Sequence, residues 1–527
     1  MAGDLKGWDE ELAFVPLIAH LFALGTQLLL NQGNARLMTR MVLPPPRTDL
    51  ERLRQELADL QGTLDETELY GTILLALVTA ESVLIQDPSL GTALPESTEL
   101  KPLSAAPGED FRNISGRVYH WIRPPSALAA LRTHRSDEAK THPPDPMPHP
   151  GIYLDRLSLY WDSDPQLPRL TRVRPAHWLA PFFRDSGDDA KNRKSFKLAL
   201  CPLEGSFHPR FAIQEGGAFF QADPGKSMAG GAKLQAHLEE VLEAADQEQV
   251  NLILFPELTV DEAAKRVLQG ELHRRSSTWS PLYGVVAGSF HCWDGSPSLP
   301  PVNRATFLGR TGETAMCHDK KGRFRVPASK VSPQFFGNVP PGPLPKEIFE
   351  DIRYGSELAI FETTLGRIAL LICADAIVAD DRGYLPLIRR LRPDLLLVIS
   401  MSDETEPFEA FAEEMSRYWI GTVFLNAHCV LKAAAGGGAP SAPQPPLLAT
   451  WNLALYQDKG CPSTLGEWRL GQEPRSRHFR NSGRSGWYPL SEDDPGLTGV
   501  SSFQGVTNSL GLVLDLGVHW SKTEKGK

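Results

Sequence analysis

The chain has 527 residues, of which 41% are hydrophobic and 22% are charged, and its formal net charge at pH 7 is -10. This length exceeds that of most single domains, and the composition is ordinary for a soluble globular protein. The negative charge argues against nonspecific binding to nucleic acid or to anionic lipid. We therefore expect no direct nucleic-acid partner.

The first 90 residues are predicted to form a small helical N-terminal domain. The N-terminus "MAGDLKGWDEE" lacks the basic region of a secretory signal. The apolar run at 14–30 is interrupted by proline, histidine and glutamine and is marginal in length for a membrane span, so we interpret it as a buried helix. Peripheral membrane contact is the less favoured alternative. Leucines at three- and four-residue steps between 53 and 64 predict a second helix, and these helices are a candidate surface for a protein partner.

Residues 91–194 are rich in proline, histidine and charge and are interpreted as a connector. From 195 to 520 the sequence alternates between apolar strand patterns and amphipathic helix patterns. Examples are "FKLALCPL", "AKLQAHLEEVLEAADQ" and "VNLILFPE". This alternation predicts an α/β fold with helices packed on a sheet.

Six cysteines are scattered along the chain without a CxxC pair, which argues against a disulfide framework and a structural zinc site. We therefore expect reduced thiols and a cytoplasmic protein. The His-Cys pairs at 291–292 and 317–318 do not have a zinc-binding spacing and are interpreted as ordinary strand residues. Neither GxxxxGK[ST] nor GxGxxG occurs, so we expect no cofactor and no metal.

Three reactive residues follow apolar strand patterns. Glu257 follows "LILFP", Lys320 lies in "HDKKG", and Cys373 ends "RIALLIC". The ends of strands in such sheets are where ligands and catalytic groups collect. A thiol that attacks, a carboxylate that moves protons and an ammonium that stabilises a negative oxygen suffice for acyl transfer. The backbone N–H of Ala374 is the natural second donor to that oxygen.

The order Glu, Lys, Cys in these contexts resembles the nitrilase superfamily of carbon–nitrogen hydrolases over about 195–520. The resemblance implies an αββα sandwich that commonly forms homo-oligomers through the helices after the nucleophile. By the same resemblance, Glu257 is general base and acid, Lys320 is the oxyanion stabiliser and Cys373 is the nucleophile.

The sequence departs from the family pattern around the lysine. His318 stands where an aromatic residue is common, and Lys321 competes with Lys320 for the catalytic role. Many members carry a second glutamate between the lysine and the cysteine, and Glu347 or Glu350 can fill that place. The proline-rich segment 325–344, which lies between the lysine and these glutamates, is unusually long.

Two residues follow the proposed nucleophile. Ala374 replaces the common aromatic residue and is expected to open or reshape the pocket beside Cys373. Asp375 is expected to orient this loop by hydrogen bonding rather than to react.

The sequence therefore predicts hydrolysis of a small amide or nitrile, at a bond other than a peptide bond, through a thioester at Cys373. One alternative is a catalytically divergent nitrilase-like scaffold in a multi-protein complex, such as those of bacterial defence systems. A second alternative is a thioester-based N-acyltransferase, because the same three residues support transfer to an amine.

Overall fold

The structure is a computed structural model, and the residues it describes fall into the ranges given at the end of this sentence: 77, 117–122, 157–162, 169–173, 194–203, 209–227, 231–278, 282–293, 295, 299–331, 333, 336–362, 367–377, 384–402, 405–417, 420–427, 447–452, 464–469, 472–478, 488–489, 499–503 and 511–518. The helical N-terminal domain predicted for 1–90 lies outside this set, apart from Leu77.

The chain divides into two compact units. The first comprises Met1–Leu167 with Pro386–Arg392, and the second comprises Pro168–Leu385 with Pro393–Lys527. In the first unit, β1 (Arg117–Ile122) and β2 (Leu157–Asp162) pair antiparallel, within the segment interpreted as a connector. The second unit carries all the other strands and is described below.

One sheet of the second unit has seven strands. Its centre is made of three parallel strands, β4, β7 and β8, and the remaining pairings are antiparallel. In spatial order the strands are β10 (Thr314–Asp319), β9 (Val302–Gly309), β8 (Gly284–Cys292), β7 (Leu252–Leu254), β4 (Lys194–Leu200), β23 (Gly511–Val518) and β22 (Gly499–Phe503).

The other large sheet has nine strands and also has a parallel centre, made of β15, β16 and β17. All residues of these three strands are buried, as expected where both faces of a parallel sheet are covered. In spatial order the strands are β21 (Tyr488–Pro489), β20 (Arg475–His478), β19 (Thr464–Arg469), β18 (Leu447–Asn452), β17 (Gly421–Asn426), β16 (Leu395–Ser400), β15 (Arg367–Ile372), β14 (Glu357–Glu362) and β3 (Arg169–Val173).

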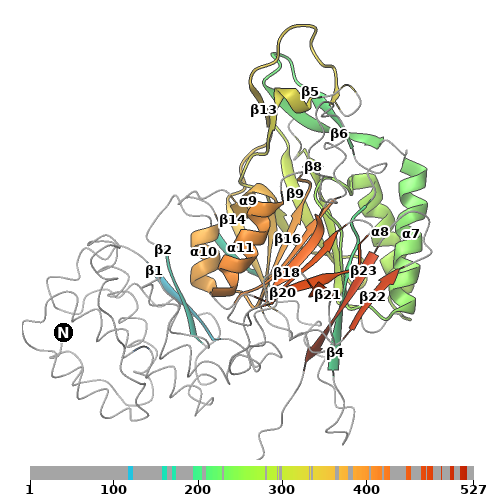
Figure 1. Ribbon diagram of the computed structural model, residues 1–527, viewed down its shortest axis with the longest axis vertical. Helices are drawn as coiled ribbons and strands as arrows, with labels where there is room; N and C mark the ends of the chain where they lie inside the picture. The colour runs from blue at the N-terminus through green and yellow to red at the C-terminus, as the bar shows by residue number, and fades with distance from the viewer. Residues whose placement is uncertain are drawn as a thin grey trace, which may run out of the picture. The chain divides into compact units, whose positions relative to one another are not determined.

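The two sheets face each other, and helices cover their outer faces (Figure 1). Phe307 of β9 and Phe361 of β14 meet between the sheets, with ring centroids 4.7 Å apart. Helices α7 (Gly231–Gln247) and α8 (Glu262–Arg275) cover the seven-stranded sheet, while α11 (Glu406–Arg417) packs on β17 and β18. The predicted αββα sandwich is thereby confirmed. A further helix of this unit is α9 (Ala374–Ile377), whereas α10 (Leu385–Leu391) belongs to the first unit from Pro386 on. None of the described helices has the length and apolar character needed to cross a bilayer.

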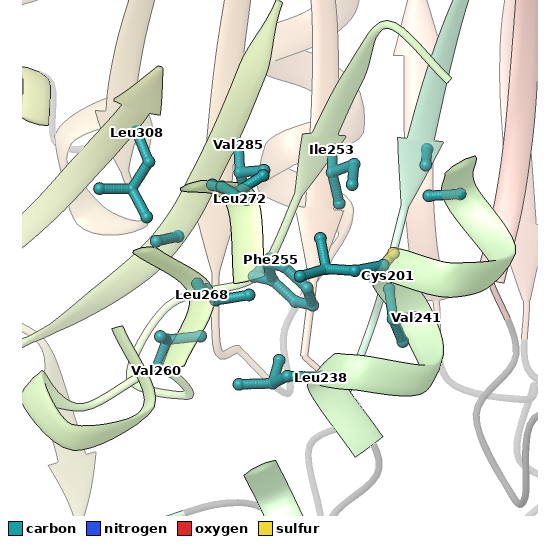
Figure 2. Close-up of a cluster of buried hydrophobic side chains, with 14 of the residues drawn as sticks. Cys201, Leu238, Val241, Ile253, Phe255, Val260, Leu268, Leu272, Val285 and Leu308 are labelled. Carbon is teal, nitrogen blue, oxygen red and sulfur yellow. The ribbon is translucent and has the colours of Figure 1, made fainter. Parts of the chain in front are cut away.

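A buried apolar cluster joins α7 and α8 to the seven-stranded sheet (Figure 2). Leu234, Leu238, Val241 and Leu242 recur at helical spacing on α7, so they line one face of the helix. They meet strand residues of β7 and β8, and Cys201 lies in the same cluster. This packing fixes the loop after β7, where Glu257 lies.

A third sheet in this unit has five short strands. In spatial order they are β11 (Arg325–Pro327), β13 (Glu347–Glu350), β6 (Phe219–Ser227), β5 (Pro209–Ile213) and β12 (Phe336–Gly337), with the 3₁₀ turn η5 (Ala328–Lys330) after β11. The long proline-rich segment noted in the sequence therefore contributes to a sheet. Its apolar side chains form a second cluster, which includes Phe290 of β8 and Met401 after β16.

Candidate active site

Glu257 lies in the loop between β7 and α8 and is only 1% exposed to solvent. The N–H of Met401 donates to its Oε2 at 3.0 Å, and Asn303 Nδ2 donates to its Oε1 at 3.0 Å. Asp261, rather than Glu257, caps α8 by accepting from the N–H of Ala264. Glu257 is therefore available for the site.

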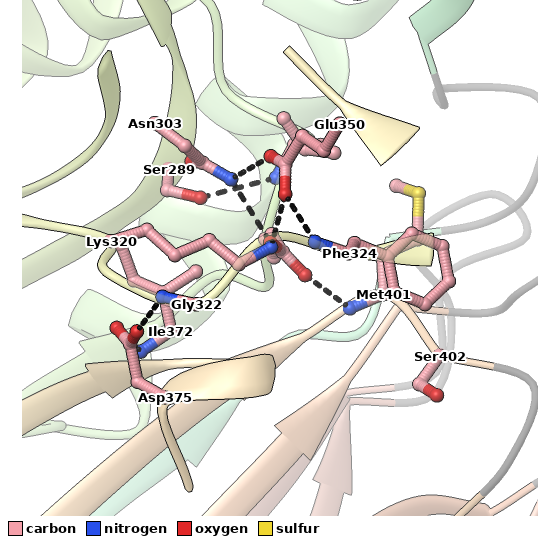
Figure 3. A network of polar contacts seen from close by, with 12 residues as sticks. Ser289, Asn303, Lys320, Gly322, Phe324, Glu350, Ile372, Asp375, Met401 and Ser402 are labelled. Carbon is pink, nitrogen blue, oxygen red and sulfur yellow. Dashed lines mark hydrogen bonds and ion pairs between the residues drawn. The ribbon is translucent and has the colours of Figure 1, made fainter. Parts of the chain in front are cut away.

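Lys320 follows β10 and is completely buried. Its Nζ donates to Glu257 Oε1 at 2.6 Å and to Glu350 Oε2 at 2.6 Å (Figure 3). The neighbouring Lys321 points elsewhere, because its Nζ lies 5.9 Å from the ring centroid of Tyr384. Of the two lysines weighed in the sequence, the structure brings Lys320 to Glu257.

The second glutamate beside Lys320 is Glu350. Strand β13 alternates its side chains between two faces, so Ile348 and Glu350 are buried whereas Glu347 is partly exposed. Glu347 lies apart from Lys320, with its Oε1 3.8 Å from Arg325. Of the two glutamates weighed in the sequence, the structure therefore places only Glu350 in the site.

Cys373 follows the last residue of β15 with a φ of 44°, in the left-handed region that non-glycine residues seldom adopt. Its N–H donates to Ile399 O at 2.8 Å, so the end of β16 holds this strained backbone in place. The charges of Lys320, Glu257 and Glu350 all act on its thiol. Ala374 begins α9, so its N–H lies in the first turn, where helix amides have no partner within the helix.

Asp375 joins the lysine loop to the cysteine loop. Its Oδ1 accepts from the N–H groups of Lys321 at 2.8 Å and Gly322 at 2.7 Å, and its Oδ2 lies 3.2 Å from His318 Nε2. The same Oδ2 accepts from Ile372 N at 3.3 Å (Figure 3). Asp375 thus orders the loop by hydrogen bonding, as expected.

Ala374, which is expected to open or reshape the pocket beside Cys373, lies against the lysine loop. A Cβ added to Gly322 would lie 2.9 Å from the Cβ of Ala374, so the two backbones are already in close contact there. Ala374 is 4% exposed. The small side chain allows the lysine loop to approach the cysteine loop.

Burial and charge set the proton affinities of the site. Burial raises the pKa of the Cys373 thiol, and the charge of Glu257 raises it further. Burial also raises the pKa of Glu257, although Lys320 opposes this. For Glu350, the charge of Lys320 and a hydrogen bond from His291 outweigh burial and lower the pKa. The two carboxylates likewise outweigh the effect of burial on Lys320 and raise its pKa. The site therefore separates a carboxyl that readily holds a proton from one that stays ionised.

Sequence reasoning missed Asn303 and His291 as parts of the site. Asn303 Nδ2 donates to Glu350 Oε1 at 2.8 Å as well as to Glu257, and His291 Nε2 lies 3.0 Å from Glu350 Oε1. His291 lies on β8, next to β7, and Asn303 lies on β9, next to β8; polar residues in largely apolar strands were the available signal. Within the described ranges, no group of three or more His, Cys, Asp or Glu residues is placed to hold a metal ion.

The chain is similar to known proteins among solved structures. No family model and no curated protein matches its sequence. Similar solved structures include an amidase from Nesterenkonia sp., with 15% identity and a TM-score of 0.31 over 62% of this chain and 92% of that chain. Another is Nit3 of Saccharomyces cerevisiae, a member of branch 10 of the nitrilase superfamily, with 14% identity and a TM-score of 0.29 over 55% and 92%. A third is a carbon–nitrogen hydrolase from Helicobacter pylori G27, with 12% identity and a TM-score of 0.29 over 54% and 88%. These similar structures are amidases and carbon–nitrogen hydrolases, the class of enzyme that the sequence resembles.

Proposed function

We propose that this protein hydrolyses a non-peptide carbon–nitrogen bond of a small amide or nitrile through a thioester at Cys373. One observation carries the proposal: the ammonium of Lys320 is buried between Glu257 and Glu350, beside a cysteine held in strained backbone at a strand end. A buried network of this kind is costly to maintain for packing alone. It supplies a base, a cation and a nucleophile in one place.

For an amide, the first step forms a bond between Cys373 Sγ and the carbonyl carbon. Glu257 accepts the thiol proton, which suits a thiol whose pKa burial has raised and a carboxyl whose pKa is raised as well. Negative charge develops on the carbonyl oxygen, where the Lys320 ammonium and the Ala374 N–H stabilise it. Glu257 then gives the proton to the nitrogen, the carbon–nitrogen bond breaks, and ammonia or an amine leaves.

The second step releases the acid. Glu257, again ionised, takes a proton from a water molecule whose oxygen attacks the thioester carbon. The carbon–sulfur bond breaks, and the proton on Glu257 returns to Cys373. A nitrile follows the same path after a first addition to its triple bond, and consumes one more water before the thioester is reached.

The burial of the site residues supports the proposal that the substrate is small. Glu257 and Cys373 are each 1% exposed, and Lys320 is not exposed at all. A folded polypeptide cannot bring a peptide bond to such a thiol, whereas a small amide can diffuse to it through modest side-chain motion. We therefore expect that polypeptides are not substrates.

The test is intact mass after treatment with electrophilic amides and nitriles, beginning with iodoacetamide. We expect Cys373→Ala to abolish one adduct, whereas Cys201→Ala leaves it in place, because Cys201 is also buried but belongs to the apolar cluster under α7. Glu257→Gln should slow formation of this adduct by about 10²-fold, the usual contribution of a general base.

Two other outcomes would redirect the proposal. If Cys373 stays unlabelled while other thiols react, the proposed hydrolysis is wrong and the nitrilase-like scaffold is favoured. If a thioester accumulates with an amide substrate until an amine is added, the chemistry at Cys373 is right but the acceptor is an amine rather than water.

A further inference from the structure

His291 of β8 makes two hydrogen bonds that fix which of its ring nitrogens carries the proton. The N–H of Ala222 on β6 donates to His291 Nδ1 at 2.9 Å. Because a backbone N–H can only donate, Nδ1 must be the unprotonated nitrogen. In the neutral ring the proton is then on Nε2, which lies 3.0 Å from Glu350 Oε1 and donates to it. His291 is completely buried at its side chain, as is Glu350.

Glu350 receives more donors than Glu257. Its Oε1 accepts from His291 and from Asn303 at 2.8 Å, and its Oε2 accepts from Lys320 at 2.6 Å and from the N–H of Phe324 at 3.0 Å. Glu257 accepts from Lys320, Asn303 and Met401 N. The two carboxylates share the cation and the asparagine, so the histidine is a distinguishing donor.

We propose that His291 is a positioning residue that, through its Nε2–H, keeps Glu350 as the permanent anion beside Lys320, so that the proton exchanged during the reaction goes to Glu257. This inference rests on the proposed function, because it assigns roles to two carboxylates of the same site. Two like charges so close to one ammonium compete for one proton. The hydrogen bond from His291 favours the ionised form of Glu350 and thereby decides that competition.

Two substitutions separate the two hydrogen bonds of His291. In His291→Asn, the side-chain oxygen takes the place of Nδ1 and still accepts from Ala222 N, but the donor to Glu350 is lost. In His291→Gln, the side-chain nitrogen takes the place of Nε2 and still donates to Glu350, but the acceptor for Ala222 is lost. A merely structural bond between β8 and β6 would make His291→Gln the worse variant.

The measurement is the pH profile of Cys373 labelling by iodoacetamide, read by intact mass. The titratable groups that share this site are Glu257 from the β7 loop, Lys320 after β10, Cys373 after β15, Glu350 on β13 and His291 on β8. Losing a donor raises the pKa of Glu350 toward that of Glu257, so in His291→Asn both carboxyls take up protons. The acid limb of the profile, which is the fall in labelling at low pH, should then move to higher pH. In His291→Gln the limb should stay within a few tenths of a unit of the wild type. Thermal midpoints of both variants report whether each is folded.

A third variant keeps the inference testable if His291→Asn does not fold. Glu350→Gln removes the charge that His291 is proposed to maintain, and labelling of Cys373 should fall by about tenfold or more across the whole pH range. Full labelling in this variant would show that no anion is needed there and would overturn the inference.

The tautomer is measured separately by ¹⁵N NMR of the histidine-labelled protein, with the His291 signal assigned by its loss in His291→Gln. A proton on Nε2 supports the inference, and a proton on Nδ1 overturns it. An acid limb that moves in neither variant, or moves in His291→Gln alone, also overturns it. If the wild type shows no labelling at Cys373, the proposed function fails, and the tautomer then decides the inference about His291 by itself.

Discussion

At the scale of single residues, the buried charge of Lys320 is matched by carboxylates on two sides. Burying an ammonium is costly, and so is burying two carboxylates, so each partner is tolerated only while the others are present. The Nζ of Lys320 lies 2.6 Å from an oxygen of each glutamate. Removing the cation leaves two buried anions that face each other.

We therefore expect Lys320→Met to destabilise the protein by about 3–5 kcal/mol, the range found when one partner of a buried ion pair is removed. Differential scanning fluorimetry should show a large fall in the thermal midpoint. Adding Glu257→Gln and Glu350→Gln to the same chain should restore much of the loss, because no unpaired charge remains buried.

The matched control is Lys321→Met. Lys321 is partly exposed, and its Nζ interacts with the ring of Tyr384 at 5.9 Å, an interaction worth about 0.5–1 kcal/mol. Equal effects of the two lysine substitutions, or no recovery in the triple variant, would show that the carboxylates are not charged around Lys320.

At the scale of elements, the contact between the lysine loop and α9 depends on a glycine. Gly322→Ala would place a Cβ 2.9 Å from Ala374 Cβ and 3.0 Å from its carbonyl carbon. One of the two loops must move, at a cost of about 1–3 kcal/mol. We expect slower labelling of Cys373 in this variant, because the shift separates Lys320 from the thiol.

A glycine-to-alanine change without such a contact gives the comparison. Gly270 lies in α8, and nothing lies within 4 Å of an added Cβ. Gly270→Ala should stabilise the protein by about 0.5–1 kcal/mol through helix propensity and leave labelling unchanged. If both variants label like the wild type, the approach of these loops does not matter for the site.

Elements with a strong periodic pattern were predictable from the sequence, and short ones were not. The runs "RIALLI" and "LLLVIS" became β15 and β16, because a continuous apolar run is typical of strands buried on both faces. Strands β11 and β12 have three and two residues, RVP and FG, and each contains a proline or a glycine. Such strands are held by pairing with β13 and β5, which no local pattern reveals.

The residues of the site likewise divide into those marked by a local sequence pattern and those placed by contacts between distant segments. Glu257 and Cys373 follow strands whose apolar patterns mark their ends, whereas Lys320 follows the mixed strand β10 and was anticipated through the family resemblance. The choice between Glu347 and Glu350 required the pleat of β13, since they are three positions apart and therefore face opposite ways. His291 belongs to the site through its contact with Glu350 on β13, a contact between segments far apart in the sequence.

At the scale of the whole second unit, the site joins the two large sheets. Glu257 follows β7 of the seven-stranded sheet but accepts from Met401 N, which follows β16 of the nine-stranded sheet. His318 of β10 lies 3.2 Å from Asp375 of α9, across the same boundary. Because the sheets also pack face to face through Phe307 and Phe361, neither is expected to unfold alone.

Two buried thiols report on the two halves of this sandwich. Cys201 lies in the cluster between α7 and the seven-stranded sheet, and Cys373 lies at the end of β15 in the nine-stranded sheet. We expect both to become labelled at the same urea concentration, measured by peptide mass spectrometry after thiol-labelling pulses too short to modify Cys373 in the folded site, because one cooperative transition exposes both. Phe361→Ala should lower both midpoints equally, by a free energy of about 3–5 kcal/mol. If Cys201 and Cys373 become reactive at separate midpoints, or if Phe361→Ala lowers that of Cys373 alone, the sheets fold independently and the network around Glu257 does not couple them.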